Sequence, residues 1–261
     1  MKIIVCIKQV PDTTEVKLDP KTGRLIRDGV PSIINPDDKN ALEEALRIKD
    51  ENPDTTVTVV SMGPPQADVA MREALAMGAD EAILISGREF GGSDTWATSY
   101  IIATAIKKIP DYDIIFCGRQ AIDGDTAQVG PQIAEQLNIP QITYVQKLDI
   151  EGDKVIVQRQ LEDGYTVVEA KMPVLLTAIK ELNTPRYMTP KGIFEAYNKT
   201  VQVWGFNDVP VDAEKIGLKG SPTNVSRTFS PEAKGKGIML EGADKETVKT
   251  LIAKLDEKHL L

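Results

Sequence analysis

Four short apolar segments, separated by stretches with the periodicity of helices, constrain the fold of this chain more than any other feature. The segments cover residues 2–7, 56–61, 82–86 and 113–117, and polar residues, glycine or proline bound each of them. Short continuous apolar runs are typical of parallel strands that are buried on both faces. Strands that alternate with helices predict right-handed βαβ units and therefore an α/β fold built on a parallel sheet.

The intervening segments carry the start and stop signals of helices. The first helix begins with Asn35 as N-cap and Pro36 in its first turn, and we expect its polar residues, Glu43 and Glu44 among them, to face water. Three more helices are expected: from about Pro65 to Met77, where Gly78 follows as a left-handed terminal residue; from Ser93 or Asp94 to before Pro110; and from about Thr126 toward Pro140.

The second half of the chain has a different pattern of apolar and polar residues. Residues 141–179 alternate between apolar and polar and contain turn sequences at 151–153 and 162–164, which predicts an antiparallel addition to the sheet. After Lys180 the chain is rich in proline, glycine and polar residues until an amphipathic helix at about 245–258. An irregular segment gains little burial from its own contacts, so we expect residues 181–261 to form an extended C-terminal arm that packs on another protein.

Composition and missing motifs exclude several classes of function. A net charge of -8 argues against a nucleic-acid binder, which normally presents a basic face. The chain has no apolar run near the roughly 18 residues that span a bilayer and starts without a signal-peptide pattern, so we expect a cytoplasmic protein. The single histidine, His259, and two cysteines in apolar segments support neither a metal site nor a hydrolytic triad. The glycine motifs of dehydrogenases and P-loop proteins are also missing.

The segment 117–131 is the most informative candidate site. It is rich in glycine and small polar residues and connects a buried strand to a helix. Unpaired amides at a helix N-terminus bind phosphate oxygens, Gly124 and Gly130 would let the backbone approach a ligand, and the hydroxyl of Thr126 can donate. The alternative is that residues 123–125 make an ordinary turn and Thr126 only caps the helix. The carboxylates at 37–38, 43–44, 123 and 125 are expected at helix starts or on solvated faces.

Seven motifs, in order along nearly the whole chain, carry a likeness to a known family. They are Val5–Pro11 (VCIKQVP), Asp28–Val30 (DGV), Ile34–Pro36 (INP), Ala74–Asp80 (ALAMGAD), Gly118–Asp123 (GRQAID), Lys171–Pro173 (KMP) and Thr184–Tyr187 (TPRY). In these residues the chain resembles the β subunit of electron-transfer flavoprotein. The resemblance implies an adenine-nucleotide-binding α/β domain over residues 1–180 and a larger α subunit, carrying a redox FAD, as partner.

The resemblance also implies a choice of cofactor. In the simple branch of the family the β subunit holds AMP, whereas in the electron-bifurcating branch it holds a second FAD that takes a hydride from NADH and divides the electrons between ferredoxin or flavodoxin and the α-subunit flavin. The segment Asp123–Pro131 resembles the bifurcating branch. By motif position, the residues expected to hold the cofactor are Cys6, Lys8, Asn35, Asp38, Met62, Asp123, Gly124, Asp125, Thr126, Ala127, Gln128, Val129, Gly130, Pro131 and Gln132.

A second expected site concerns partner proteins. Residues 188–196 resemble the recognition loop with which the family docks on an acyl-CoA dehydrogenase, with Pro190 where an apolar anchor is expected and with Ile193 and Phe194 as apolar contacts. An ordinary connecting loop is the alternative. For the whole chain, the rival from another class is a universal-stress-type ATP-binding protein, which would share the sheet without redox chemistry. The chain is expected to act as an electron-carrier subunit, with any NADH-oxidising activity only in the complex.

Overall fold

The computed structural model describes residues 1–12, 31–226, 235 and 237–261. It contains two compact units, Met1–Asn224 and Val225–Leu261. The motif Asp28–Val30, one of the seven that carry the resemblance, lies outside the described residues.

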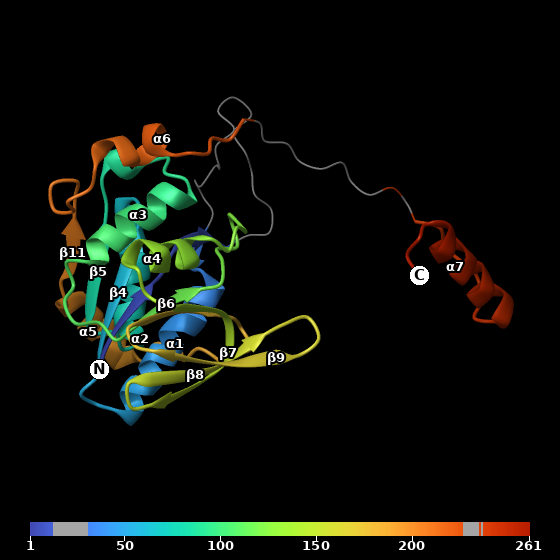
Figure 1. The fold of residues 1–261 in the computed structure, drawn as a ribbon, viewed down its shortest axis with the longest axis horizontal. Helices are drawn as coiled ribbons and strands as arrows, with labels where there is room; N and C mark the ends of the chain where they lie inside the picture. The colour runs from blue at the N-terminus through green and yellow to red at the C-terminus, as the bar shows by residue number, and fades with distance from the viewer. Residues whose placement is uncertain (13–30, 227–234, 236) are drawn as a thin grey trace. The chain divides into compact units, whose positions relative to one another are not determined.

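Among the described residues, a sheet of nine strands forms the centre of the first unit, in the order β11-β5-β4-β1-β6-β10-β7-β8-β9 (Figure 1). Pairing is parallel from β11 to the first part of β7 and antiparallel from β7 to β9. The strands are β1 (Lys2–Cys6), β4 (Thr56–Met62), β5 (Glu81–Ile85), β6 (Ile114–Gly118), β7 (Gln141–Glu151), β8 (Lys154–Gln160), β9 (Tyr165–Lys171), β10 (Val174–Ala178) and β11 (Val201–Trp204). The predicted α/β fold with an antiparallel addition is confirmed.

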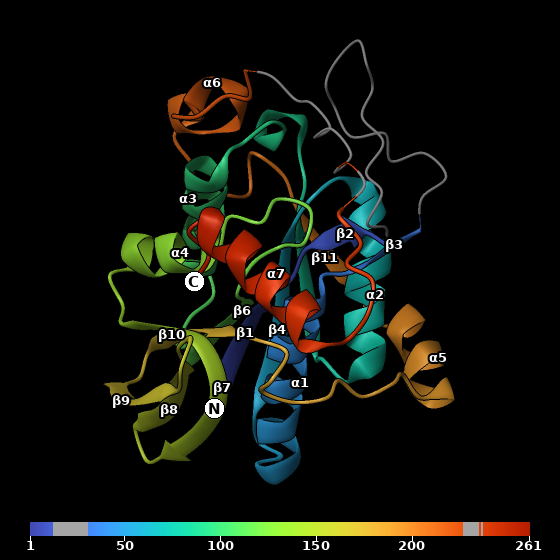
Figure 2. The same ribbon diagram turned by 90° about the vertical axis from the view of Figure 1, so that its right-hand side faces the viewer.

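Helices cover both faces of the parallel part of the sheet (Figure 2). Alternate residues of β1 belong to different cores: Ile3 and Val5 pack with α1 and α2, and Ile4 and Cys6 pack with α3 and α4. Burial on both faces is why these strands read as continuous apolar runs. The helices and short strands are α1 (Pro36–Glu51), η1 (Pro65–Ala67), α2 (Asp68–Met77), η2 (Arg88–Phe90), α3 (Thr95–Ile106), α4 (Val129–Leu137), α5 (Pro190–Asn198), η3 (Ala213–Lys215), α6 (Gly217–Gly220), β2 (Gln9–Pro11) and β3 (Ser32–Ile34).

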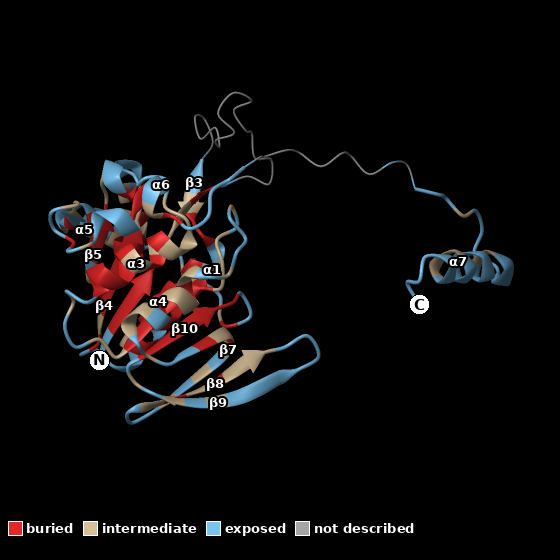
Figure 3. Ribbon diagram, turned by 45° about the horizontal axis from the view of Figure 1, so that its top comes forward, coloured by how far each residue is buried: buried red, intermediate tan, exposed pale blue. Residues whose placement is uncertain are grey.

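The strand β10 departs from the expectation for residues 141–179. It is not part of the antiparallel addition but lies between β6 and β7 and runs parallel to both. All five of its residues are buried, whereas only Val155 and Val157 are buried in the hairpin strands β8 and β9 (Figure 3). A strand covered on both faces needs apolar residues throughout, and the sequence Val174–Ala178 (VLLTA) has the texture of the other parallel strands.

The segment after Lys180 is more ordered than its composition indicates. The first unit extends to Asn224, and β11 adds a parallel edge strand beside β5. Arg186 donates to Glu43 from Nε at 2.9 Å and from Nη2 at 3.0 Å, and Asn183 donates to Glu44 at 2.8 Å. Glu43 and Glu44 are therefore buried, and the prediction that they face water is wrong, because the segment around Asn183 and Arg186 crosses α1 on that face.

The second unit contains the predicted terminal helix as α7 (Lys245–Glu257). The carboxylate of Asp244 caps it by accepting from the amide of Thr247 at 2.8 Å and from its hydroxyl at 3.0 Å. Val248, Leu251 and Ile252 are exposed on it.

Candidate functional site

A cleft of about 430 Å³ opens at the carboxyl edge of the sheet, where β1 and β6 lie side by side. The connections from these two strands lead to helices on opposite faces of the sheet, α1 and α4, so the crevice lies at the topological switch point where α/β proteins bind their ligands. Five segments of the chain line it: the end of β1 with the residues after it, the start of α1 at Asp38, the end of β4, the start of α3, and the end of β6 with its connection to α4.

Most of the residues expected to hold a cofactor line this cleft. They are Cys6, Lys8, Asp38, Met62, Gly124, Asp125, Thr126, Ala127, Gln128, Val129 and Gly130. The remaining four, Asn35, Asp123, Pro131 and Gln132, do not line it. Whether any of them touches a ligand stays a prediction.

The backbone of the β6–α4 connection presents free amides to the cleft. The helix α4 begins at Val129, three residues after the expected start at Thr126. The amides of Gly124 and Asp125 donate to Ala121, and residue 131 is a proline without an N–H. The amides of residues 126–130 have no acceptor within the described part of the chain. With no acidic residue in the first turn of α4, this short stretch is suited to an anion.

The same connection holds two non-glycine residues with positive φ, Asp125 at 53° and Ala127 at 51°. This conformation costs an ordinary residue about 1–2 kcal/mol. Ala127 is followed by Gln128 in a right-handed helical conformation, an alternation that lets successive N–H groups converge on one anion. Backbone strain of this kind persists where the surrounding structure holds it and is common at ligand sites.

The side chain of Asn35 joins the start of α1 to the β6–α4 connection. It occupies the N-cap position of α1, but its side chain makes no capping hydrogen bond. Its Nδ2 donates to the carbonyl of Gln120 at 2.8 Å, and its Oδ1 accepts from the amide of Ile122 at 3.0 Å. Because the side chain is fully buried with both ends bonded, it fixes the β6–α4 connection, and its expected contact with a ligand stays a prediction.

Asp38 ties the ends of β1 and β6 together. Its carboxylate accepts from the amide of Lys8 at 2.7 Å and from the amide of Gly118 at 2.9 Å. Burial is the main reason that the pKa of Asp38 is raised to about 7, and the hydrogen bonds oppose the increase. Asp38 lies at a helix start, as expected, and its carboxylate is buried because α1 starts directly against the end of β6.

Charge in the cleft is concentrated on a few residues. The ammonium of Lys8 lies 2.6 Å from the carboxylate of Asp123, which is nearly buried. The Nε of Arg119 lies 3.3 Å from Asp37. Gln120 also donates to Asp125. Lys8 and Arg119 are therefore the cations available to an anionic ligand in the cleft.

Two glycines in the cleft are required by packing. A Cβ on Gly118 would lie 2.3 Å from the Asp38 carboxylate and 2.6 Å from its amide nitrogen. A Cβ on Gly130 would lie 2.8 Å from a methyl of Thr177 on β10. Gly130 thus brings α4 close to the sheet, and the expected approach of a ligand there stays a prediction. Gly124 has open space beside it.

Sequence reasoning missed the contribution of α3. Ser93, Asp94, Thr95, Thr98 and Ile102 line the cleft, and Thr95 donates to the side chain of Gln128 at 3.2 Å. The signal was an N-cap residue, Asp94, at the start of a helix that follows β5, but only the sheet order places that helix beside α4.

Two thiols lie at the floor of the cleft. Cys6 and Cys117, at the ends of neighbouring strands, are free and buried. The hydrogen bond with Cys6, followed by burial, raises the pKa of the Cys117 thiol well above its usual value. Cys117 is therefore a neutral lining group at physiological pH. The described residues contain no cluster of three or more His, Cys, Asp or Glu side chains that could hold a metal ion.

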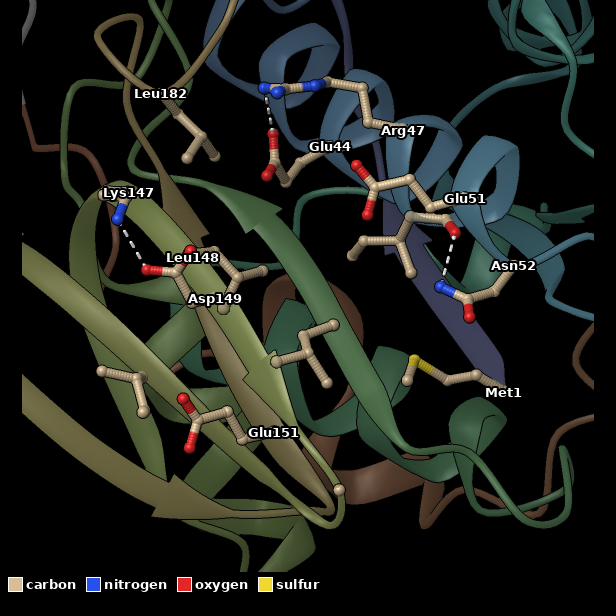
Figure 4. Close-up of a pocket in the computed structure, with 14 residues that line it drawn as sticks. Met1, Glu44, Arg47, Glu51, Asn52, Lys147, Leu148, Asp149, Glu151 and Leu182 are labelled. Carbon is tan, nitrogen blue, oxygen red and sulfur yellow. Dashed lines mark hydrogen bonds and ion pairs between the residues drawn. The ribbon is translucent and has the colours of Figure 1, made fainter.

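A larger hollow of about 910 Å³ lies elsewhere, between α1 and β7 (Figure 4). Its two basic side chains each form an ion pair within their own element. On α1, Arg47 lies 3.3 Å from Glu44, and on β7, Lys147 lies 2.7 Å from Asp149. Its lining residues include Glu151, the last residue of β7, but no helix N-terminus. We therefore assign the candidate ligand site to the smaller cleft.

The expected partner-binding residues lie on α5. Pro190 is its first residue, after Thr189, whose hydroxyl caps the helix by accepting from Gly192 at 3.0 Å. Ile193 and Phe194 are exposed, the latter at 77%. The helix packs on α2, where Arg72 donates to the carbonyl of Ala196 at 3.0 Å. An exposed aromatic residue on an anchored helix suits docking, which remains a prediction.

Comparison with known proteins decides the family. The model of the electron transfer flavoprotein domain matches residues 22–209. The chain is 62% identical to an electron transfer flavoprotein subunit beta of Thermoanaerobacterium thermosaccharolyticum over the full length of both. The chain belongs to the electron transfer flavoprotein family, among its β subunits.

Two further relatives of this β subunit carry more specific names. It is 58% identical to the caffeyl-CoA reductase-Etf complex subunit CarD of Acetobacterium woodii, with all of both chains covered. It is 53% identical to the acryloyl-CoA reductase electron transfer subunit gamma of Anaerotignum propionicum, again over the full length of both. The family resemblance in the sequence motifs is confirmed. In the described part of this β subunit, no helix has the length and apolar character needed to cross a bilayer.

Proposed function

We propose that this β subunit binds FAD in the cleft between β1 and β6 and takes part, with an α subunit, in NADH-dependent electron bifurcation. The observation that carries the proposal is the set of free amides at residues 126–130, held on a strained connection at the strand ends. These amides would receive the pyrophosphate, with Lys8 as the adjacent cation. The family assignment disfavours the universal-stress-type alternative.

The space beside the cleft favours FAD over AMP. A second hollow of about 820 Å³ shares Lys8, Met62 and Ser93 with the cleft, so the space continues past the proposed phosphate site toward the ends of β4 and β5. A mononucleotide needs only the first hollow, whereas a dinucleotide extends into the second. NADH would approach through this second space. A β subunit that holds AMP is the alternative.

When bound, FAD supplies a group that accepts a hydride and passes electrons on singly. The chain's own residues bind and orient it. Asn35 fixes the connection that carries the amides, Asp38 joins the strand ends, and the buried thiols of Cys6 and Cys117 line the cleft. The proposed electron acceptors are ferredoxin or flavodoxin and, through the α-subunit FAD, an acyl-CoA dehydrogenase-type partner. This partner would dock on α5, and the complex would be cytoplasmic.

The test is the identity and number of the nucleotides. The chain is co-expressed with its α subunit, the heterodimer is purified and denatured, and the released nucleotides are separated and counted. Two FAD per heterodimer, with NADH-dependent reduction of ferredoxin, would support the proposal. One FAD and one AMP would assign the chain to the simple carrier branch. In a matched pair, Lys8→Met should weaken nucleotide binding and Lys147→Met, in the other hollow, should not.

A further inference from the structure

The residues at the start of α3 also form hydrogen bonds with the last residues of the first unit. Asp94 caps α3 by accepting from the amide of Ala97 at 2.9 Å through Oδ1. Its Oδ2 accepts from Thr223 twice, from the amide at 2.9 Å and from the hydroxyl at 2.7 Å. The amide of Asp94 donates to the hydroxyl of Ser221 at 2.9 Å. One residue of the cleft therefore makes three hydrogen bonds to the segment that ends at Asn224.

Neighbouring contacts reinforce this attachment. The hydroxyl of Ser93 accepts from the amide of Gly217 at 2.9 Å. Gly92 and Gly217 have φ of 81° and 63°, and a Cβ on Gly217 would lie 2.5 Å from the carbonyl oxygen of Glu89. The two segments are thus packed backbone against backbone. We call residues 92–94 with 217–223 the exit clasp.

The exit clasp also reaches the proposed phosphate site. Thr95, the residue after Asp94, donates to the side chain of Gln128 at 3.2 Å, and Gln128 is the N-cap of α4. Contacts between α3 and α4 continue along their length. A connected path therefore runs from the free amides at residues 126–130 through Thr95 and Asp94 to Thr223.

Both oxygens of the Asp94 carboxylate accept hydrogen bonds from the protein. Burial acts to raise its pKa, but the hydrogen bonds from Ala97 and Thr223 outweigh burial and hold the pKa below its usual value. An ionised carboxylate beside an anion site would repel the ligand unless its charge were engaged elsewhere. Here one oxygen accepts a hydrogen bond from α3 and the other accepts two from Thr223, so the negative charge stabilises the exit clasp.

We propose that Asp94 is a positioning residue that couples occupancy of the cleft to the exit clasp, from which the C-terminal segment begins. A nucleotide in the cleft would order the starts of α3 and α4, and through Asp94 it would fix Ser221 and Thr223. This coupling rests on the proposed nucleotide site and goes beyond it.

Hydrogen exchange of the full chain in its heterodimer tests the coupling. Amides of residues 217–223 are measured with the cleft emptied and with FAD or AMP restored. The expected result is that FAD slows their exchange in the wild type. Thr223→Val keeps the size of the side chain but removes the hydroxyl donor, and Asp94→Asn removes an acceptor. Each should lose the FAD-dependent protection and raise the Kd for FAD by about tenfold, the effect of one hydrogen bond to a charged group.

Two further variants separate coupling from general stability. Thr223→Ser keeps the hydroxyl and should restore wild-type behaviour. Asp244→Asn removes the same kind of Asp–Thr cap from α7 and should leave FAD binding and protection at 217–223 unchanged. The coupling is refuted if FAD protects residues 118–130 but leaves 217–223 unaffected, or if Thr223→Val behaves as the wild type. Should FAD protect neither region, the proposed function fails and the coupling with it.

Discussion

Replacing Asn35 with alanine should detach the β6–α4 connection from α1. The side chain is fully buried and joins the connection at two points, the carbonyl of Gln120 and the amide of Ile122. Each lost partner costs about 1–2 kcal/mol when a backbone group is left unsatisfied, so the expected loss in free energy of unfolding is roughly 2–4 kcal/mol. The free amides at residues 126–130 would no longer be held in place, and nucleotide affinity should fall at least about tenfold.

Asn40→Ala is the matched control for this prediction. Asn40 is also buried in α1, and its amide donates to the backbone and side-chain oxygens of Asn183 at 2.8 and 3.1 Å, away from the cleft. It should lose comparable stability and keep its nucleotide. Urea unfolding of the chain measures stability, and nucleotide titration of the heterodimer measures affinity. Wild-type affinity in Asn35→Ala, or an equal loss of affinity in Asn40→Ala, would refute the reasoning.

Three more predictions follow from single residues. Ala127→Gly should raise the free energy of unfolding by about 1 kcal/mol, because glycine adopts positive φ freely; thermal unfolding checks this, and a loss would count against the strained backbone. Folding raises the pKa of Asp38, so the folded state binds more protons than the unfolded state, and the free energy of unfolding should fall as pH rises from about 4 to about 7. Urea titrations should show this slope in the wild type and not in Asp38→Asn. Phe194→Ser should slow electron transfer to an acyl-CoA dehydrogenase-type partner, measured by dye reduction, while Val167→Ser on β9, similarly exposed, should not.

Local signals predicted many of the elements correctly. The four apolar segments became β1, β4, β5 and β6, and Gly78 ends α2 with a positive φ of 132°. The turn at 151–153 joins β7 to β8, with Gly152 at φ 62°. Each of these outcomes depends on residues close together in the chain, so the sequence alone carries the information. The start of α4 was placed three residues early because the strained conformations of Asp125 and Ala127 leave no local signature.

The site itself was only half predictable. Motif positions indicated Lys8, Met62 and the β6–α4 connection, all of which line the cleft. They did not indicate that Asn35 supports this connection through hydrogen bonds, and they missed Asp94 and Thr95. A motif identifies which segment belongs to a site, but it does not distinguish a side chain that faces the ligand from one that holds the segment in place.

The sequence by itself determined the alternation of strands and helices, the turns and the family, because periodicity, caps and motifs are properties of contiguous residues. Only the tertiary structure decided that β10 runs parallel between β6 and β7, that Glu43 and Glu44 are buried, and that α3 joins the cleft. These outcomes depend on contacts between residues more than 30 positions apart, such as Glu43 with Arg186, Leu175 with Gln141 and Thr95 with Gln128. Such contacts depend on how the layers pack, which no local pattern encodes.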